Sequence, residues 1–227
     1  MNLNSYIEHT LLKPEATSAA FKTLCAEAKQ YSFLGVCVNS SWVSFCRSEL
    51  DELFRDEDQK KSKLVAVVGF PLGVCLTEAK SFETTRAVEA GADEIDMVLH
   101  LGWMKEGRIK DVEKDIRAVV AAAQGLPVKV IFETHLLTQE EKIAACFASI
   151  EAGACFVKTS TGFTGGGATV EDVALMKKHV GEKLGVKASG GVRSQESALL
   201  MIKAGAVRLG TSSGVTIVQG GTIGSSY

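Results

Sequence analysis

Two lysines in this chain stand where a lysine is costly unless it has a use, each at the end of an apolar, strand-like run. Lys158 follows Cys155-Phe156-Val157 and precedes a glycine-rich loop, and Lys187 ends a similar run one predicted strand later. Adjacent parallel strands lie about 4.8 Å apart, so the two ammonium groups would be close, and burial and like charge lower the pKa of an amine. A neutral amine attacks carbonyl carbon. We therefore predict that Lys158 forms a Schiff base and that Lys187 perturbs it. The alternative is that each lysine ends its strand and extends into solvent.

Asp96 is the carboxylate predicted to accompany these lysines. It interrupts an apolar strand-like run, Ile95-Asp96-Met97-Val98. Imine formation needs proton transfers to and from the carbinolamine oxygen, and a carboxylate beside the amine can mediate them directly or through water. Asp96 is therefore predicted to be either this proton-transfer group or only the counter-ion of a lysine. Glu133, at the end of a neighbouring strand, is expected to be a supporting partner of a lysine.

Glycines and hydroxyl residues cluster in the late loops. In α/β barrels, the loops after the last two strands commonly bind phosphate through backbone N–H groups and a helix N-terminus. Arg193 is either an additional cation for this phosphate or an ordinary surface arginine. The late loops thus favour a phosphorylated small-molecule substrate, and the predicted phosphate-binding residues are Gly162, Gly190, Gly191, Gly210, Ser212 and Ser213.

The elements that must position these residues alternate along the chain, short apolar β-rich runs with longer helical patterns. This alternation is typical of successive βα units around a parallel sheet. Strands are predicted at residues 6–11, 35–39, 64–70, 94–99, 129–133, 155–159, 185–189 and 207–211. Helices are predicted at residues 17–31, 41–53, 77–90, 108–124, 138–152, 169–180 and 194–204. No composition change marks a linker, so residues 1–227 are predicted to form one α/β domain, a (β/α)8 TIM barrel.

A weak repeat marks three helix ends. Each carries Ala-Gly-Ala, with the glycines at 91, 153 and 205, and a strand follows in each case. Such a glycine suits the left-handed position that ends a helix. Asp96, Lys158 and Gly210 lie five residues after these glycines. The shared offset predicts that all three reach similar heights near the carboxyl ends of their strands, the face where barrel enzymes place their active sites.

Composition excludes several other classes of protein. The 227 residues are 46% hydrophobic and 23% charged with a net charge of −2, and no basic block or long apolar run suggests a nucleic-acid or membrane partner. The N-terminus lacks the features of a secretory signal, and six scattered cysteines indicate reduced thiols in a cytoplasmic protein. The four histidines show no metal-ligand spacing, so no metal or other cofactor is expected. The tail at about 215–227 is expected to be flexible.

The chain resembles the bacterial-type deoxyribose-phosphate aldolases almost from end to end. The motifs that carry the resemblance are His9-Thr10-Leu11-Leu12-Lys13-Pro14, Val68-Gly69-Phe70-Pro71-Leu72-Gly73, Glu94-Ile95-Asp96-Met97-Val98, Phe156-Val157-Lys158-Thr159-Ser160-Thr161-Gly162-Phe163, Lys187-Ala188-Ser189-Gly190-Gly191-Val192-Arg193 and Gly210-Thr211-Ser212-Ser213. The resemblance implies a metal-independent class I aldolase that reversibly cleaves 2-deoxy-D-ribose 5-phosphate into D-glyceraldehyde 3-phosphate and acetaldehyde. It implies that Lys158 is the Schiff-base lysine, Lys187 the lysine that perturbs it, and Asp96 the proton-transfer group. It also implies the phosphate site given above and a barrel that commonly forms a homodimer.

Several positions depart from the family pattern. Glu8 stands where the family usually has aspartate, Phe163 stands where some members carry a phosphate-binding lysine, and Trp103 is unusual in its loop. Tyr227 matches the terminal tyrosine that the family links to proton abstraction from the imine. Two rival functions stay open: a lysine-dependent aldolase for a different sugar phosphate, and a barrel that binds sugar phosphates without catalysis.

Overall fold

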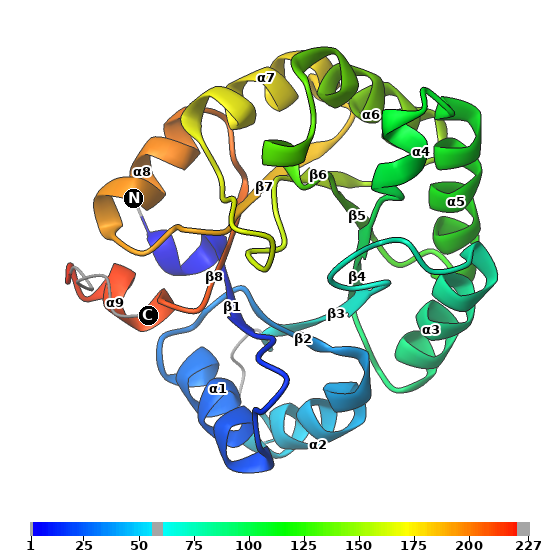
Figure 1. Cartoon of the computed structure of the whole chain (residues 1–227). Helices are drawn as coiled ribbons and strands as arrows, with labels where there is room; N and C mark the ends of the chain where they lie inside the picture. Colours follow the sequence, from blue (N-terminus) through cyan, green and yellow to red (C-terminus); the bar gives the residue numbers. More distant parts are fainter. Residues whose placement is uncertain (1, 56–60, 222–227) are drawn as a thin grey trace.

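The strands of this protein close into a ring. A computed structural model describes residues 2–55 and 61–221, and in this part of the chain eight parallel strands follow one another in chain order, with β8 paired to β1. They are β1 (Ile7–Leu11), β2 (Gly35–Asn39), β3 (Lys63–Val68), β4 (Glu94–Val98), β5 (Val128–Ile131), β6 (Phe156–Lys158), β7 (Gly185–Ser189) and β8 (Arg208–Thr211). Figure 1 shows the helices in an outer ring around them. The predicted (β/α)8 barrel is confirmed.

In the described part of the chain, seven long helices lie where they were predicted. They are α1 (Ser18–Gln30), α2 (Val43–Leu53), α3 (Thr77–Glu89), α5 (Ile109–Ala122), α6 (Gln139–Glu151), α7 (Val170–Val180) and α8 (Gln195–Lys203). Short helices were not predicted: η1 (Leu3–Tyr6), η2 (Ser40–Trp42), α4 (Leu101–Lys105), η3 (Thr134–Leu136) and α9 (Gly214–Val218). Helix α9 occupies the start of the tail that was expected to be flexible. Residues 222–227 of that tail, which include Tyr227, lie outside the described residues.

The glycine repeat ends its helices as predicted. Gly91, Gly153 and Gly205 have φ of 99°, 84° and 115°, which a side chain would resist. Each turn leads directly into β4, β6 or β8. Strand pairing then places Lys158 of β6 opposite Lys187 of β7, and Asp96 of β4 opposite Lys129 of β5. The helix-ending signal therefore fixes where the strands of Asp96 and Lys158 begin, and strand pairing places Lys129 and Lys187 opposite them.

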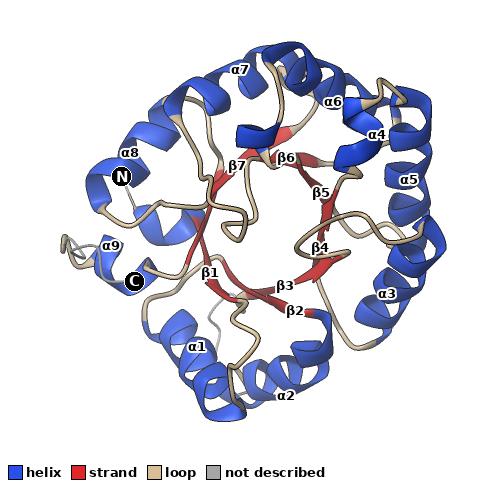
Figure 2. Ribbon diagram, viewed as in Figure 1, coloured by secondary structure: helices blue, strands red, loops and turns tan. Residues whose placement is uncertain are grey.

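Alternation along the strands separates two layers of side chains. In β3, Leu64, Ala66 and Val68 belong to the large core between strands and helices. Val65 and Val67 instead belong to a small apolar cluster, which also contains Leu12 and Cys37. Successive side chains of a strand point to opposite faces, so this second cluster lies inside the barrel. Figure 2 shows the red strands around this interior. It is apolar beside β2 and β3 and charged beside β4–β7, and Glu8 of β1 adds a further buried charge.

Candidate active site

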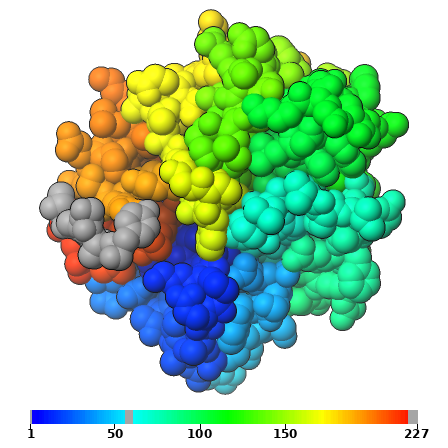
Figure 3. Space-filling model, viewed as in Figure 1, coloured from blue at the N-terminus to red at the C-terminus, as the bar shows by residue number. Residues whose placement is uncertain are grey.

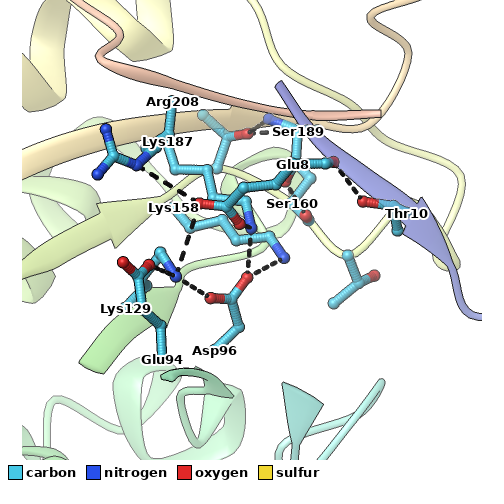
Figure 4. Close-up of polar contacts among 12 residues, drawn as sticks. Glu8, Thr10, Glu94, Asp96, Lys129, Lys158, Ser160, Lys187, Ser189 and Arg208 are labelled. Carbon is cyan, nitrogen blue, oxygen red and sulfur yellow. Dashed lines mark hydrogen bonds and ion pairs between the residues drawn. The ribbon is translucent and has the colours of Figure 1, made fainter. Parts of the chain in front are cut away.

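Asp96 lies at the centre of three lysines inside the barrel (Figure 4). Its Oδ2 accepts hydrogen bonds from Lys158 Nζ at 2.8 Å and from Lys187 Nζ at 2.6 Å. Its Oδ1 accepts a hydrogen bond from Lys129 Nζ at 2.9 Å. None of the four residues is more than 3% exposed. The structure thus brings the predicted residues Lys158, Lys187 and Asp96 together, and the alternative in which the lysines extend into solvent is wrong.

Lys129 belongs to this group and was not predicted. It lies in β5 opposite Asp96, and its ammonium also contacts Glu94 at 2.6 Å. A signal existed in the sequence, because Lys129 interrupts the apolar run Val128-Lys129-Val130-Ile131. A lysine in the interior of a buried strand needs a carboxylate partner just as a lysine at a strand end does.

Two further acids complete the group. Glu8 contacts Lys187 directly and lies 3.7 Å from Lys129 Nζ, while Glu94 contacts Lys129. We call these six residues the charge cluster: Glu8, Glu94, Asp96, Lys129, Lys158 and Lys187. Within the described chain, Lys187 contacts two acids of the cluster and Lys129 contacts three, whereas Lys158 contacts only Asp96. Lys158 is therefore the lysine held by the least negative charge.

The opposite charges of the cluster keep Asp96, Lys129 and Lys187 in their ionised forms. Burial alone would raise the pKa of Asp96, but Lys129, Lys158 and Lys187 hold that pKa well below its ordinary value. Burial alone would lower the pKa of Lys187, but Asp96 and Glu8 raise it above its ordinary value, and Asp96 and Glu8 likewise raise the pKa of Lys129. At neutral pH, Asp96 is therefore negative, and two fixed cations flank Lys158. Of the predicted lysine pair, Lys187 is not the one that loses its proton.

A cavity of about 340 Å³ opens at the carboxyl ends of the strands, and Lys158 is the member of the charge cluster that lines it. Phosphate-site candidates Gly162, Gly190, Gly191, Gly210 and Ser212 also line this cavity, together with Arg193. Arg193 is thus placed at the predicted site rather than on a remote surface. The cavity joins an amine at its floor to glycine backbone and a hydroxyl group along its wall.

Ser213 is the phosphate-site candidate that does not line the cavity in the described structure. It precedes α9 and is buried, and its backbone N–H donates to Thr211 Oγ1 at 2.9 Å. Its neighbour Ser212 lies on the cavity side of this turn. The late loop therefore presents one of its two serines to the cavity.

Phe163 and Trp103, two departures from the family pattern, differ in their relation to the cavity. Phe163 lines the cavity, is 47% exposed, and packs edge-on against Phe70 with ring centroids 5.2 Å apart. In Figure 3 the loop between β6 and α7 (yellow) reaches the middle of this face, beside the segments that follow β1 (blue) and β3 (cyan). Trp103 lies in α4 and stacks on His100 with ring centroids 4.0 Å apart, and it does not line the cavity. Phe163, and not Trp103, therefore shapes the entrance.

The prediction that Glu133 supports a lysine is wrong. Its carboxylate accepts hydrogen bonds from the backbone N–H and the hydroxyl group of Thr161, and the ion-pair contact described for it is with His135 Nδ1 at 3.5 Å. The side chain leaves the barrel interior because the Glu133 backbone is left-handed, with φ of 56°. A strand-like continuation of β5 would have predicted a different direction.

The described residues outside the charge cluster and its cavity offer no competing centre of chemistry. Among residues 2–55 and 61–221, no group of three or more histidine, cysteine, aspartate or glutamate side chains could hold a metal ion. No helix in these ranges combines the length and the apolar character that crossing a membrane requires. Cys37 is buried beside Val65 and Val67, and burial raises its pKa. These features leave the charge cluster and its cavity as the centre of chemistry.

Comparison with known proteins agrees with this site. A family model described as DeoC/LacD family aldolase matches residues 6–222. A deoxyribose-phosphate aldolase of Bdellovibrio bacteriovorus is 56% identical over 227 residues, covering 100% of both chains. A deoxyribose-phosphate aldolase of Brevibacillus brevis is 56% identical over 228 residues, again with 100% of both chains covered.

Solved structures show the same similarity in three dimensions. The deoxyribose-phosphate aldolase of Aeropyrum pernix superimposes with a TM-score of 0.87 at 35% identity, covering 96% of this chain and 89% of the other. That relative is a tetramer. The residues matched by the family model, 6–222, contain all eight described strands of the barrel.

Proposed function

This chain belongs to the DeoC/LacD aldolase family, and from that premise we propose how its charge cluster and cavity work. The protein is a lyase, a class I aldolase that reversibly cleaves 2-deoxy-D-ribose 5-phosphate to D-glyceraldehyde 3-phosphate and acetaldehyde through a lysine Schiff base. The observation that carries the assignment of residues is that Lys158 belongs to the buried cluster and also lines the cavity.

Lys158 is the nucleophile in this proposal. Its amine adds to the C1 aldehyde of open-chain deoxyribose 5-phosphate, and the carbinolamine loses water to give the imine. The C3 hydroxyl group then gives up its proton, the C2–C3 bond breaks, and glyceraldehyde 3-phosphate leaves. The remaining enamine gains a proton at C2, and hydrolysis of the imine releases acetaldehyde and the free amine.

Asp96 is the proton-transfer group of the proposal, and Lys187 holds its charge in place. Asp96 Oδ2 lies 2.8 Å from Lys158 Nζ and 2.6 Å from Lys187 Nζ, so one oxygen is within reach of both the reacting amine and a fixed cation. Such a carboxylate can carry protons to and from the carbinolamine oxygen directly or through a water. The family resemblance assigns removal of the methyl proton in the synthetic direction to Tyr227, which lies outside the described residues.

The phosphate of the substrate binds along the cavity wall in this proposal. Gly162, Gly190 and Gly191 have positive φ, which exposes backbone N–H groups to a ligand, and Arg193 lines the same cavity. Gly210 and Ser212 lie on the next loop, and Ser213 supports that loop from behind. Backbone and arginine donors take the role that a lysine at position 163 would otherwise fill.

Borohydride trapping tests this assignment. Acetaldehyde and borohydride should add one two-carbon unit to the peptide that contains Lys158, detected by mass spectrometry, while deoxyribose 5-phosphate is cleaved in the untreated enzyme. Labelling at other lysines only would refute the role of Lys158. Fructose phosphates assayed in parallel separate this activity from that of another sugar-phosphate aldolase, and binding without imine formation would indicate a barrel that only binds its ligand.

Two properties of the whole protein complete the proposal. We place the protein in the cytoplasm, because all six cysteines are free in the structure and cytoplasmic conditions keep thiols reduced.

We also propose a homodimer. Apolar side chains of the segment after β3 and of α3 are more than half exposed, namely Leu72, Val74, Leu76 and Phe82, and such groupings often mark interfaces. Light scattering of the protein and of Phe82→Glu would test it, since a monomeric parent protein would contradict the proposal.

A further inference from the structure

Glu133 is a buried carboxylate that the proposed reaction does not use. It follows β5, is fully buried, and does not line the cavity. Its backbone is left-handed, with φ of 56° and ψ of 61°. Ser32 and Gln124, the other described non-glycine residues with positive φ, are exposed and lie just beyond helix ends. A buried left-handed glutamate persists only where its surroundings determine its conformation.

The backbone on each side of Glu133 is fixed to the neighbouring strand. Phe132 N–H donates to Lys158 O at 2.9 Å, and Thr134 N–H donates to Thr159 O at 3.1 Å. The pairing of the chain after β5 with the chain after β6 therefore continues on both sides of the left-handed residue. This turn directs the carboxylate toward the loop that follows Lys158.

The carboxylate holds the first part of that loop. Thr161 N–H lies 3.3 Å from each carboxylate oxygen, and the Thr161 hydroxyl group donates to Oε2. Thr161 Oγ1 in turn accepts from Phe163 N–H at 3.1 Å. Thr161, Gly162 and Phe163 all line the cavity. One buried carboxylate thus sets the position of three consecutive wall residues through a short chain of hydrogen bonds.

His135, two residues after Glu133, holds the same loop further along. Its Nε2 lies 3.0 Å from Thr164 O and its Nδ1 lies 3.5 Å from the Glu133 carboxylate. A Cβ atom on Gly166 would come within 2.1 Å of the His135 ring, so the loop backbone packs directly against it. The side chains of Glu133 and His135 therefore hold the loop between β6 and α7 at two points, Thr161 and Thr164.

We propose that Glu133 is a positioning residue for recognition of the phosphorylated half of the substrate. Through Thr161 it holds the Gly162 backbone and the Phe163 ring where the phosphate end of the substrate enters. Imine formation at Lys158 depends instead on the charge cluster, with which Glu133 makes no side-chain contact among the described residues. The inference rests on the proposed function. It assigns the preference for a phosphorylated over an unphosphorylated substrate to a residue outside the cavity.

The variant Glu133→Gln tests this inference. An amide keeps the shape of the side chain but removes its negative charge and one acceptor oxygen, so Thr161 N–H no longer lies between two acceptors and its hydrogen bonds lose their charged partner. The kcat/KM ratio of 2-deoxyribose 5-phosphate to unphosphorylated 2-deoxyribose should fall by roughly 10- to 100-fold, the equivalent of one hydrogen bond to a charged group. Most of the loss should lie in KM. The rate of borohydride trapping with acetaldehyde should stay within about twofold of the parent rate. The reason is that Glu133 makes no side-chain contact with the charge cluster among the described residues.

Matched variants separate positioning from general damage. Asp115→Asn changes another fully buried carboxylate, outside the barrel interior, and should leave the substrate ratio unchanged. Thr161→Val removes the hydroxyl link and should reproduce the fall in the ratio, while Thr161→Ser should retain it. The Thr161 pair also carries the test if Glu133→Gln does not fold.

Three results would overturn the inference: equal losses for the two substrates, slower trapping of acetaldehyde, or an unchanged ratio in both Glu133→Gln and Thr161→Val. A parent enzyme that fails to cleave deoxyribose 5-phosphate would instead refute the proposed function.

Discussion

Buried lysines and acids meet in two layers of this molecule, and only one of these groups reaches a cavity. Between α3 and α5, Lys80 pairs with Asp115 at 2.6 Å, and both side chains are fully buried. Lys80 also donates to Val98 O at 3.0 Å, and Asp115 accepts from Thr77 Oγ1 at 2.8 Å. One cation meets one anion, and both have further hydrogen bonds. This pair ties two helices to the end of β4.

The charge cluster inside the barrel shares its charges unequally. Three lysines contact Asp96, and Lys158, the one with the fewest acid contacts, lines the cavity. A closed pair such as Lys80 and Asp115 has no place for a substrate, whereas an underpaired amine beside a cavity does. Burial of a lysine is therefore a weak indicator of catalysis. Unequal pairing and access to a cavity together are a stronger one.

Replacing the lysine of each group should separate the two roles most strongly. Lys158→Ala removes the nucleophile, and cleavage of deoxyribose 5-phosphate should fall by at least about 10³-fold. Lys80→Met should retain borohydride trapping of acetaldehyde at Lys158 in the folded fraction. Turnover assays and peptide mass spectrometry measure both effects. Substantial turnover by Lys158→Ala would rule out covalent catalysis at this residue.

Replacing the acid of each group should give the next largest contrast. Asp96→Asn keeps the size of the side chain but cannot take up a proton, so imine formation and turnover should slow by about 10²- to 10⁴-fold. Asp115→Asn should leave the trapping rate of the folded protein near that of the parent. If Asp96→Asn traps acetaldehyde at the parent rate, Asp96 is only a counter-ion, which was the alternative left open by the sequence.

The sequence predicts the barrel and the central trio because their signals are local. Ala-Gly-Ala segments end three helices, and the fixed offset from them brings Asp96 and Lys158 to one region of the barrel. Lys129 was missed because the predicted strand began at this residue, whereas β5 begins at Val128 and the Lys129 side chain is fully buried inside the barrel. The short helices α4 and α9 span five residues each, too few for a clear periodic pattern.

Glu133 shows what local signals cannot supply. Its strand end was predicted, but its left-handed backbone and its bonds to Thr161 depend on the loop after the next strand. No periodicity links residues 28 positions apart in the sequence. The direction of a side chain beyond a strand end is thus a tertiary property, and the predicted lysine partner was wrong for that reason.

The two groups should also differ in what they contribute to stability. Lys80→Met leaves Asp115 buried without its ionic partner and should reduce the free energy of unfolding by about 3–5 kcal/mol. Lys80→Met combined with Asp115→Leu removes both charges and should recover much of this loss. Urea unfolding followed by circular dichroism measures both. Equal stability of the single and double variants would show that the unpaired charge is not the cause.

The pH dependence of stability should report the smallest difference, at the centre of the charge cluster. Lysine neighbours hold the pKa of Asp96 below its ordinary value, so the ionised carboxylate stabilises the fold above about pH 4, the unfolded reference. This contribution is lost as the pH falls through the folded pKa. The urea midpoints of the parent protein and Asp96→Asn should therefore differ at pH 6 and begin to converge as the pH falls below about 4, because the unfolded parent chain then binds a proton that the folded carboxylate resists. A gap that stays constant down to pH 2 would mean that Asp96 stabilises the barrel through its shape and hydrogen bonds rather than through its charge.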